Sequence, residues 1–83
     1  MISTLELVKG FINSHHGWAV ADQFEDSYDG EYYYNFGMQN HNALQYIHEI
    51  LQELVESDVL SDSALDDLKT YLDYLKTYLG ENS

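Results

Sequence analysis

The sequence predicts one small α+β domain in the order helix, β-hairpin, helix, helix. Three segments carry apolar residues at helical spacing, aromatic residues crowd around an Asp29-Gly30 turn dipeptide, and 83 residues suffice for one domain only. The two C-terminal helices are expected to lie antiparallel and to pack on the hairpin. Residues 1–83 are therefore expected to form a single acidic domain, with residues 81–83 frayed.

The first helix is predicted over residues 3–15. Ser3 followed by Glu6 is a capping-box pattern, in which each side chain bonds to the backbone N–H of the other residue. Apolar residues then recur every three or four positions, until the polar segment from Asn13 to Gly17 ends the helix. The predicted buried positions are Leu5, Val8, Phe11 and Ile12.

The hairpin is expected to have strands over residues 18–24 and 31–37. Aromatic side chains crowd at residues 32–36, and they suit a pleated surface better than a helical one. Between the strands, Asp29 and Gly30 supply the turn, and we expect Tyr28 at its tip to be exposed. The predicted residues on one side of the first strand are Trp18, Val20 and Phe24.

The second helix is predicted over residues 42–56, with Asn40 or Asn42 as its N-cap. Its apolar residues form one stripe with a period of about 3.6 residues, which is typical of a helix that packs on a core. The stripe consists of Leu44, Ile47, Leu51, Leu54 and Val55, widened by Ala43, Tyr46 and Ile50.

The third helix is predicted to begin near Ser61 or Ser63, where Ser63 and Asp66 resemble a capping box. Gly80 is placed as a C-cap, so the helix is expected to end there. The connection to the preceding helix is short, and short connections join antiparallel neighbours. The predicted buried face consists of Leu65, Leu68, Leu72, Leu75 and Leu79.

The composition excludes several classes of function. Fifteen acidic residues against three lysines give a net charge of −12, so the chain cannot build the cationic surface that nucleic acid or an anionic membrane requires. The absence of cysteine excludes disulfides and thiolate chemistry. No secretory signal and no apolar run of membrane-spanning length are recognised, so a cytoplasmic protein is expected.

Enzyme and metal motifs each fail at a named residue. The segment that begins at His48 starts like the zinc-protease motif HExxH, but Gln52 stands where the second imidazole is needed. A calcium loop with Gly30 at its sixth position would place Phe36, instead of a glutamate, at its twelfth. We therefore predict no enzymatic activity, no catalytic residue, no metal ligand and no cofactor.

The carboxylates gather in the centre of the sequence, with no lysine between Lys9 and Lys69. Carboxylates interleaved with tyrosine rings suit arginine-rich partners, because they offer salt bridges and cation–π contacts together. The predicted partner-binding residues are Asp22, Glu25, Asp26, Tyr28, Asp29, Glu31, Tyr32, Tyr33, Tyr34, Glu49, Glu53 and Glu56. In the alternative interpretation, Tyr32, Tyr34 and Tyr46 belong to the core and the acids only solubilise the protein.

A small acidic protein whose carboxylates line a helix and a hairpin resembles the DNA-mimic inhibitors of phage type, which include anti-restriction proteins, anti-CRISPR proteins and glycosylase inhibitors. The resemblance is one of size, charge and element order. It implies a non-enzymatic inhibitor that blocks a basic nucleic-acid-binding protein or nuclease, and that acts in the host cytoplasm if a phage encodes it. Two alternatives remain: an acidic adaptor or regulatory module, which could form a homodimer, and an immunity or antitoxin protein against a basic nuclease.

Overall fold

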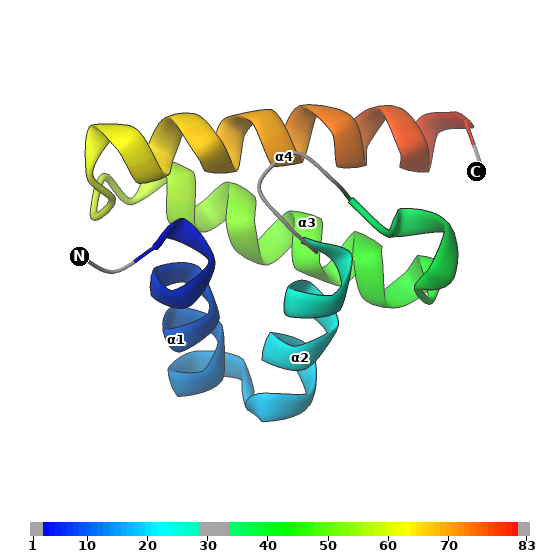
Figure 1. Ribbon diagram of the computed structural model, residues 1–83, viewed down its shortest axis with the longest axis horizontal. Coiled ribbons are helices and arrows are strands. Elements are labelled where there is room, and N and C mark those ends of the chain that lie inside the picture. The colour runs from blue at the N-terminus through cyan, green and yellow to red at the C-terminus, as the bar shows by residue number, and fades with distance from the viewer. Residues whose placement is uncertain (1–2, 29–33, 82–83) are drawn as a thin grey trace.

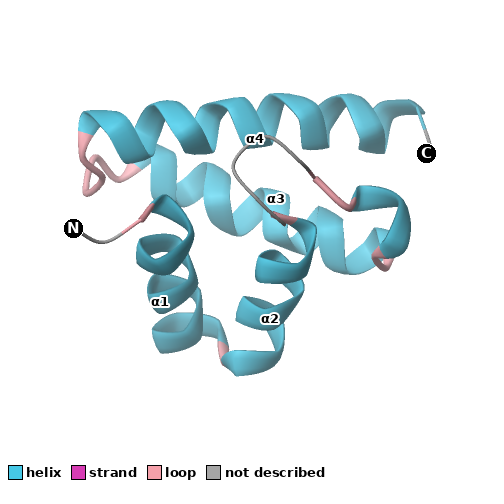
Figure 2. Ribbon diagram, viewed as in Figure 1, coloured by secondary structure: helices cyan, strands magenta, loops and turns pink. Residues whose placement is uncertain are grey.

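The computed structural model describes residues 3–28 and 34–81, and within these residues every regular element is helical (Figures 1 and 2). In chain order the elements are α1 (Thr4–His16), α2 (Trp18–Ser27), the short 3₁₀-helix η1 (Phe36–Met38), α3 (His41–Glu56) and α4 (Asp62–Glu81).

The helices pack as two antiparallel pairs. Helices α3 and α4 lie side by side along the long axis of the molecule, and α1 and α2 run across them as a second pair (Figure 1). Helix α2 contacts α3, and α1 contacts α4. A hydrogen bond of 2.7 Å from the Thr4 hydroxyl to the Asp67 carboxylate joins the start of α1 to α4.

The predicted α+β fold is wrong, because the segment expected to form the first strand, residues 18–24, lies in α2. A strand with Val20 and Phe24 on its core face would also place Asp22 on that face, where an unpaired carboxylate is costly. A helix avoids this conflict. It buries Ala21 and Phe24, which are three positions apart, and leaves Asp22 exposed.

The second predicted strand, residues 31–37, is also contradicted where the structure describes it. Residues 31–33 lie outside the described part, and Phe36 begins η1 instead of continuing a strand. The aromatic rings serve a different purpose from cross-strand pairing: the ring of Tyr34 stacks on that of Phe36 at a centroid distance of 5.5 Å, and both rings contact Tyr71 of α4.

The helix ends follow local sequence signals in most places. Ser3 caps α1 by accepting a hydrogen bond from the N–H of Glu6, and Asn40 caps α3 by accepting one from Ala43. Ser61 caps α4 by accepting from the N–H of Ala64. The prediction for the C-terminus is wrong, because Gly80 lies inside α4, which continues to Glu81.

The core is one cluster that contains both aliphatic side chains and aromatic rings. Tyr71 lies at the centre of the aromatic part, fully buried, with its hydroxyl 2.7 Å from the Ser27 hydroxyl. Ser27 in turn donates to the carbonyl oxygen of Phe24 at 2.8 Å. The buried core residues include Val8, Ile12, Phe24, Tyr28, Leu44, Ile47, Leu51, Leu54, Leu68, Tyr71 and Leu75.

Candidate functional site

The outer face of α3 carries a line of carboxylates. Glu49, Glu53 and Glu56 are all exposed, and they follow one another at i, i+4 and i+7, so they lie on the same side of the helix. The other exposed side chains of α3 are uncharged: Asn42, Gln45, Tyr46 and Gln52. This face of α3 therefore presents negative charge that no cation of α3 offsets.

The spacing of these carboxylates can be compared with that of DNA phosphates. At a rise of 1.5 Å per residue, the line from Glu49 to Glu56 spans about 10 Å. One DNA strand carries about four phosphates over that length, at one charge per 3.4 Å. The α3 face thus offers three charges where a strand has about four, which is a comparable but lower density.

Glu56 differs from the other two glutamates in its surroundings. It lines a shallow hollow between α3 and α4 together with Lys69 and Lys76 of α4. Lys69 and Lys76 bring positive charge to the hollow that Glu56 lines, and Asp73 of α4 offsets part of it. Glu49 and Glu53 therefore form the least compensated part of the α3 face.

The predicted acids of α2 are divided between surface and interface. Asp22 and Asp26 are exposed, whereas Glu25 accepts a hydrogen bond of 2.8 Å from the ammonium of Lys9 on α1. This bond to Glu25 raises the pKa of Lys9 above its usual value, and the charges of Asp22 and Asp26 add to the effect. Residues 18–27 contain no basic residue, but the packing of α1 against α2 places Lys9 beside them.

Two predicted tyrosine anchors belong to the aromatic core. Tyr28 is 5% exposed and contacts the rings of Phe24, Tyr34 and Tyr71, so the expectation of an exposed Tyr28 is wrong. Tyr34 is partly buried, and desolvation raises the pKa of its phenol above the usual value. The remaining candidates, Asp29, Glu31, Tyr32 and Tyr33, lie outside the described residues.

Two other aromatic residues are exposed beside the acids. Trp18 is 72% exposed at the start of α2, one turn before Asp22. Tyr46 is 47% exposed on α3, one turn before Glu49, and its hydroxyl lies 3.2 Å from Nδ1 of His16 at the end of α1. A helical interpretation of residues 18–27 would have placed Trp18 beside Asp22, and the i, i+3 spacing would have placed Tyr46 beside Glu49.

No cluster of three or more potential metal-binding side chains occurs among the residues that the structure describes. Within the same residues, no helix is both long and apolar enough to cross a lipid bilayer. Comparisons of the chain with protein-family models, with curated proteins and with solved structures find no match.

Proposed function

We propose that this protein is a non-enzymatic inhibitor that binds a basic nucleic-acid-binding protein and occupies the surface where that protein holds phosphates. The observation that carries the proposal is the exposed line of Glu49, Glu53 and Glu56 on α3, in a chain with a net charge of −12. Asp22 and Asp26 on α2 add exposed carboxylates. Trp18 and Tyr46 replace Tyr28 and Tyr34 as aromatic anchors.

The placement of charge on α3 supports a binding role, because it is unfavourable for the helix itself. The C-terminal end of a helix carries a partial negative charge, which favours lysine or arginine in the last turn. The last turn of α3 has no basic residue, and Glu53 and Glu56 lie there instead. Acids at this end lower helix stability, so solubility alone is a poor reason for placing them there.

The proposed partner follows from the chemistry of the surface. A protein that binds DNA presents lysine and arginine side chains spaced to meet phosphates, and carboxylates at comparable density can occupy the same cationic groove. Long-range attraction makes such an association fast and strongly dependent on salt. A homodimer is a weaker explanation, since two chains of charge −12 repel each other.

A capture experiment with matched charge variants tests the proposal. Immobilised wild-type protein should retain a nucleic-acid-binding protein from a lysate. Excess duplex DNA should displace this captured protein. The double variant Glu49→Gln/Glu53→Gln should lose this protein, because it removes the least compensated charges. The control variant Asp66→Asn/Asp73→Asn also loses two negative charges, but from α4, and it should retain the captured protein.

Two results would contradict the proposal. In one, the same protein is captured equally by the α3 variant and by the α4 control. In the other, capture does not weaken when the salt concentration rises several-fold, although a complex made from many ion pairs should lose affinity steeply with salt.

A further inference from the structure

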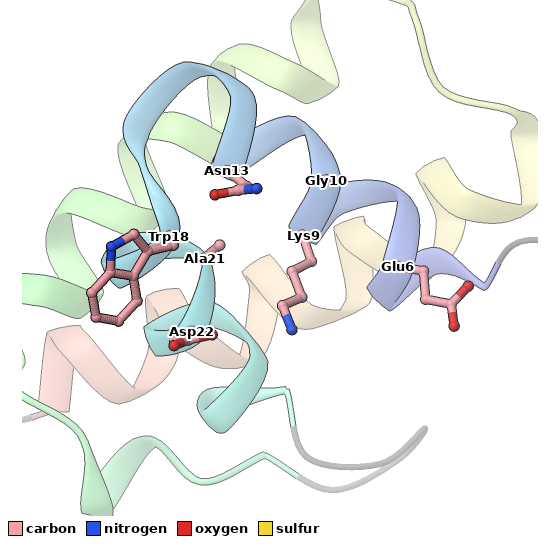
Figure 3. Close-up of a pocket in the computed structure, with 7 residues that line it drawn as sticks. All are labelled: Glu6, Lys9, Gly10, Asn13, Trp18, Ala21 and Asp22. Carbon is pink, nitrogen blue, oxygen red and sulfur yellow. The ribbon is translucent and has the colours of Figure 1, made fainter.

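A shallow hollow of about 390 Å³ lies between α1 and α2 on the surface (Figure 3). Helix α1 forms one wall, and the start of α2 forms the other. We call this hollow the α1–α2 groove. Its lining residues are Glu6, Lys9, Gly10, Asn13, Trp18, Ala21 and Asp22.

Gly10, in the middle of α1, has no role in the packing that the structure describes. A Cβ built at this position would meet nothing within 4 Å, and its φ lies outside the left-handed region that requires glycine. Glycine inside a helix is less stable than alanine, because it loses more conformational freedom on folding. One physical reason for such a glycine is the close approach of a bound group to the backbone.

The exposure of Trp18 also indicates that the groove binds a ligand. An indole that is 72% exposed leaves a large apolar surface in water, and the fold gains little from it. Trp18 and Asp22 are four positions apart on α2, so their Cβ atoms are about 5–6 Å apart. A flat aromatic face and a carboxylate therefore lie next to each other at the groove edge, with Asn13 on the facing helix (Figure 3).

The charge of the groove selects a cationic occupant. Its single internal cation, Lys9, is held by Glu25 at 2.8 Å. The charges of Asp22 and Asp26 also act on this ammonium, so it faces three carboxylates, and Glu6 adds a fourth to the lining of the groove. The groove keeps a negative balance after its own salt bridge has formed.

We propose that the α1–α2 groove receives an arginine side chain of the basic partner, an inference that rests on the proposed function. The aliphatic part of the arginine lies over Gly10, its guanidinium stacks on the Trp18 indole, and its N–H groups donate to the Asp22 carboxylate. The Asn13 amide oxygen offers a second acceptor on the facing wall. Arginine fits better than lysine because its planar group stacks on a ring and donates to a carboxylate at once.

The test uses a tri-arginine peptide amide as the probe and the Trp18 indole N–H resonance as the readout, since the chain has one tryptophan. Addition of tri-arginine should shift this resonance and the backbone amide of Asp22. Tri-citrulline, which keeps the shape but lacks the charge, should shift neither. Tri-lysine should bind more weakly than tri-arginine.

Gly10→Gln should abolish the response to tri-arginine, because the added side chain fills the groove. Its melting temperature should be unchanged or higher by about 2–8 °C, since the glycine is replaced by a better helix former. Gly10→Ala, which adds only a methyl group between the backbone and the arginine, should weaken the response without abolishing it. Trp18→Ala should weaken binding about tenfold, read from the Asp22 amide, and it provides a second test on an exposed side chain.

Two results would overturn the groove proposal: an unchanged Trp18 resonance on addition of tri-arginine, or a Gly10→Gln variant that responds like the wild type. The variant Glu49→Gln/Glu53→Gln should still respond to tri-arginine. If that variant loses the captured partner while Gly10→Gln retains it at full affinity, the proposed function stands and the groove proposal fails. If both variants retain the partner fully, both proposals fail.

Discussion

The hydrogen bond between Ser27 and Tyr71 should stabilise the fold in a way that a double-mutant cycle can measure. The two hydroxyl oxygens lie 2.7 Å apart, and both side chains are fully buried. Ser27 also donates to the carbonyl oxygen of Phe24, so Tyr71 must be the donor in the bond that joins them. This bond attaches the end of α2 to the middle of α4.

The two single variants should differ in their cost. Ser27→Ala leaves the Tyr71 hydroxyl buried among aromatic rings without its acceptor, which should lower the free energy of unfolding by about 1–3 kcal/mol. Tyr71→Phe leaves Ser27 with its carbonyl acceptor, so the expected loss is about 0.5–1.5 kcal/mol. The double variant should cost less than the sum of the two, because no unpaired hydroxyl remains.

Urea denaturation of the wild type and the three variants measures these free energies, and near-ultraviolet circular dichroism checks that the aromatic packing is retained. In a domain of this size, 1 kcal/mol corresponds to about 4–8 °C in melting temperature, so both methods resolve the effects. The reasoning is refuted if Tyr71→Phe costs as much as Ser27→Ala and the two losses are additive.

Three further predictions concern the glycines, alkaline stability and Lys9. Gly10→Ala should raise the free energy of unfolding by about 0.5–1 kcal/mol. Gly17→Ala should lower it by about 1–3 kcal/mol, because Gly17 has a φ of 93°, which is strained for a residue with a side chain. Thermal melts of the two variants compare these effects. Burial raises the pKa of the Tyr71 phenol well above its usual range. The contribution of the protonated phenol to stability is therefore fully present below about pH 10 and falls at higher pH. Urea titrations across that range should show the free energy of unfolding declining, and declining less steeply in Tyr71→Phe. Lys9→Met removes the cation from the α1–α2 groove and should tighten tri-arginine binding, and calorimetry that finds weaker binding contradicts the charge argument.

The sequence predicted the three long helices because their signals are local. Ser3, Asn40 and Ser61 each bond to a backbone N–H three residues ahead, and the apolar spacing of the second predicted helix repeats over four turns. The exposed line from Glu49 to Glu56 could be predicted for the same reason, since helical spacing alone places those side chains on one face.

The hairpin prediction was wrong because it relied on aromatic content, whereas Phe24, Tyr28 and Phe36 lie in a core between helices. Residues 18–27 do contain a helical signal, because Ala21 and Phe24 are apolar and spaced at i, i+3. The aromatic Trp18 and the β-branched Val20, however, are residue types that are enriched in strands. The pairing of Glu25 with Lys9 and the burial of Tyr28 depend on how α2 packs against α1 and α4, which no local pattern contains.

The most direct test of the proposed function is whether the captured partner can hold DNA and this protein at the same time. Fluorescence anisotropy of a labelled DNA duplex bound to that partner, titrated with the acidic protein, measures this. We predict full displacement of the duplex by the wild type, at concentrations that rise with salt, and weak displacement by Glu49→Gln/Glu53→Gln. A ternary complex, in which the duplex stays bound while the acidic protein saturates the partner, would contradict DNA mimicry.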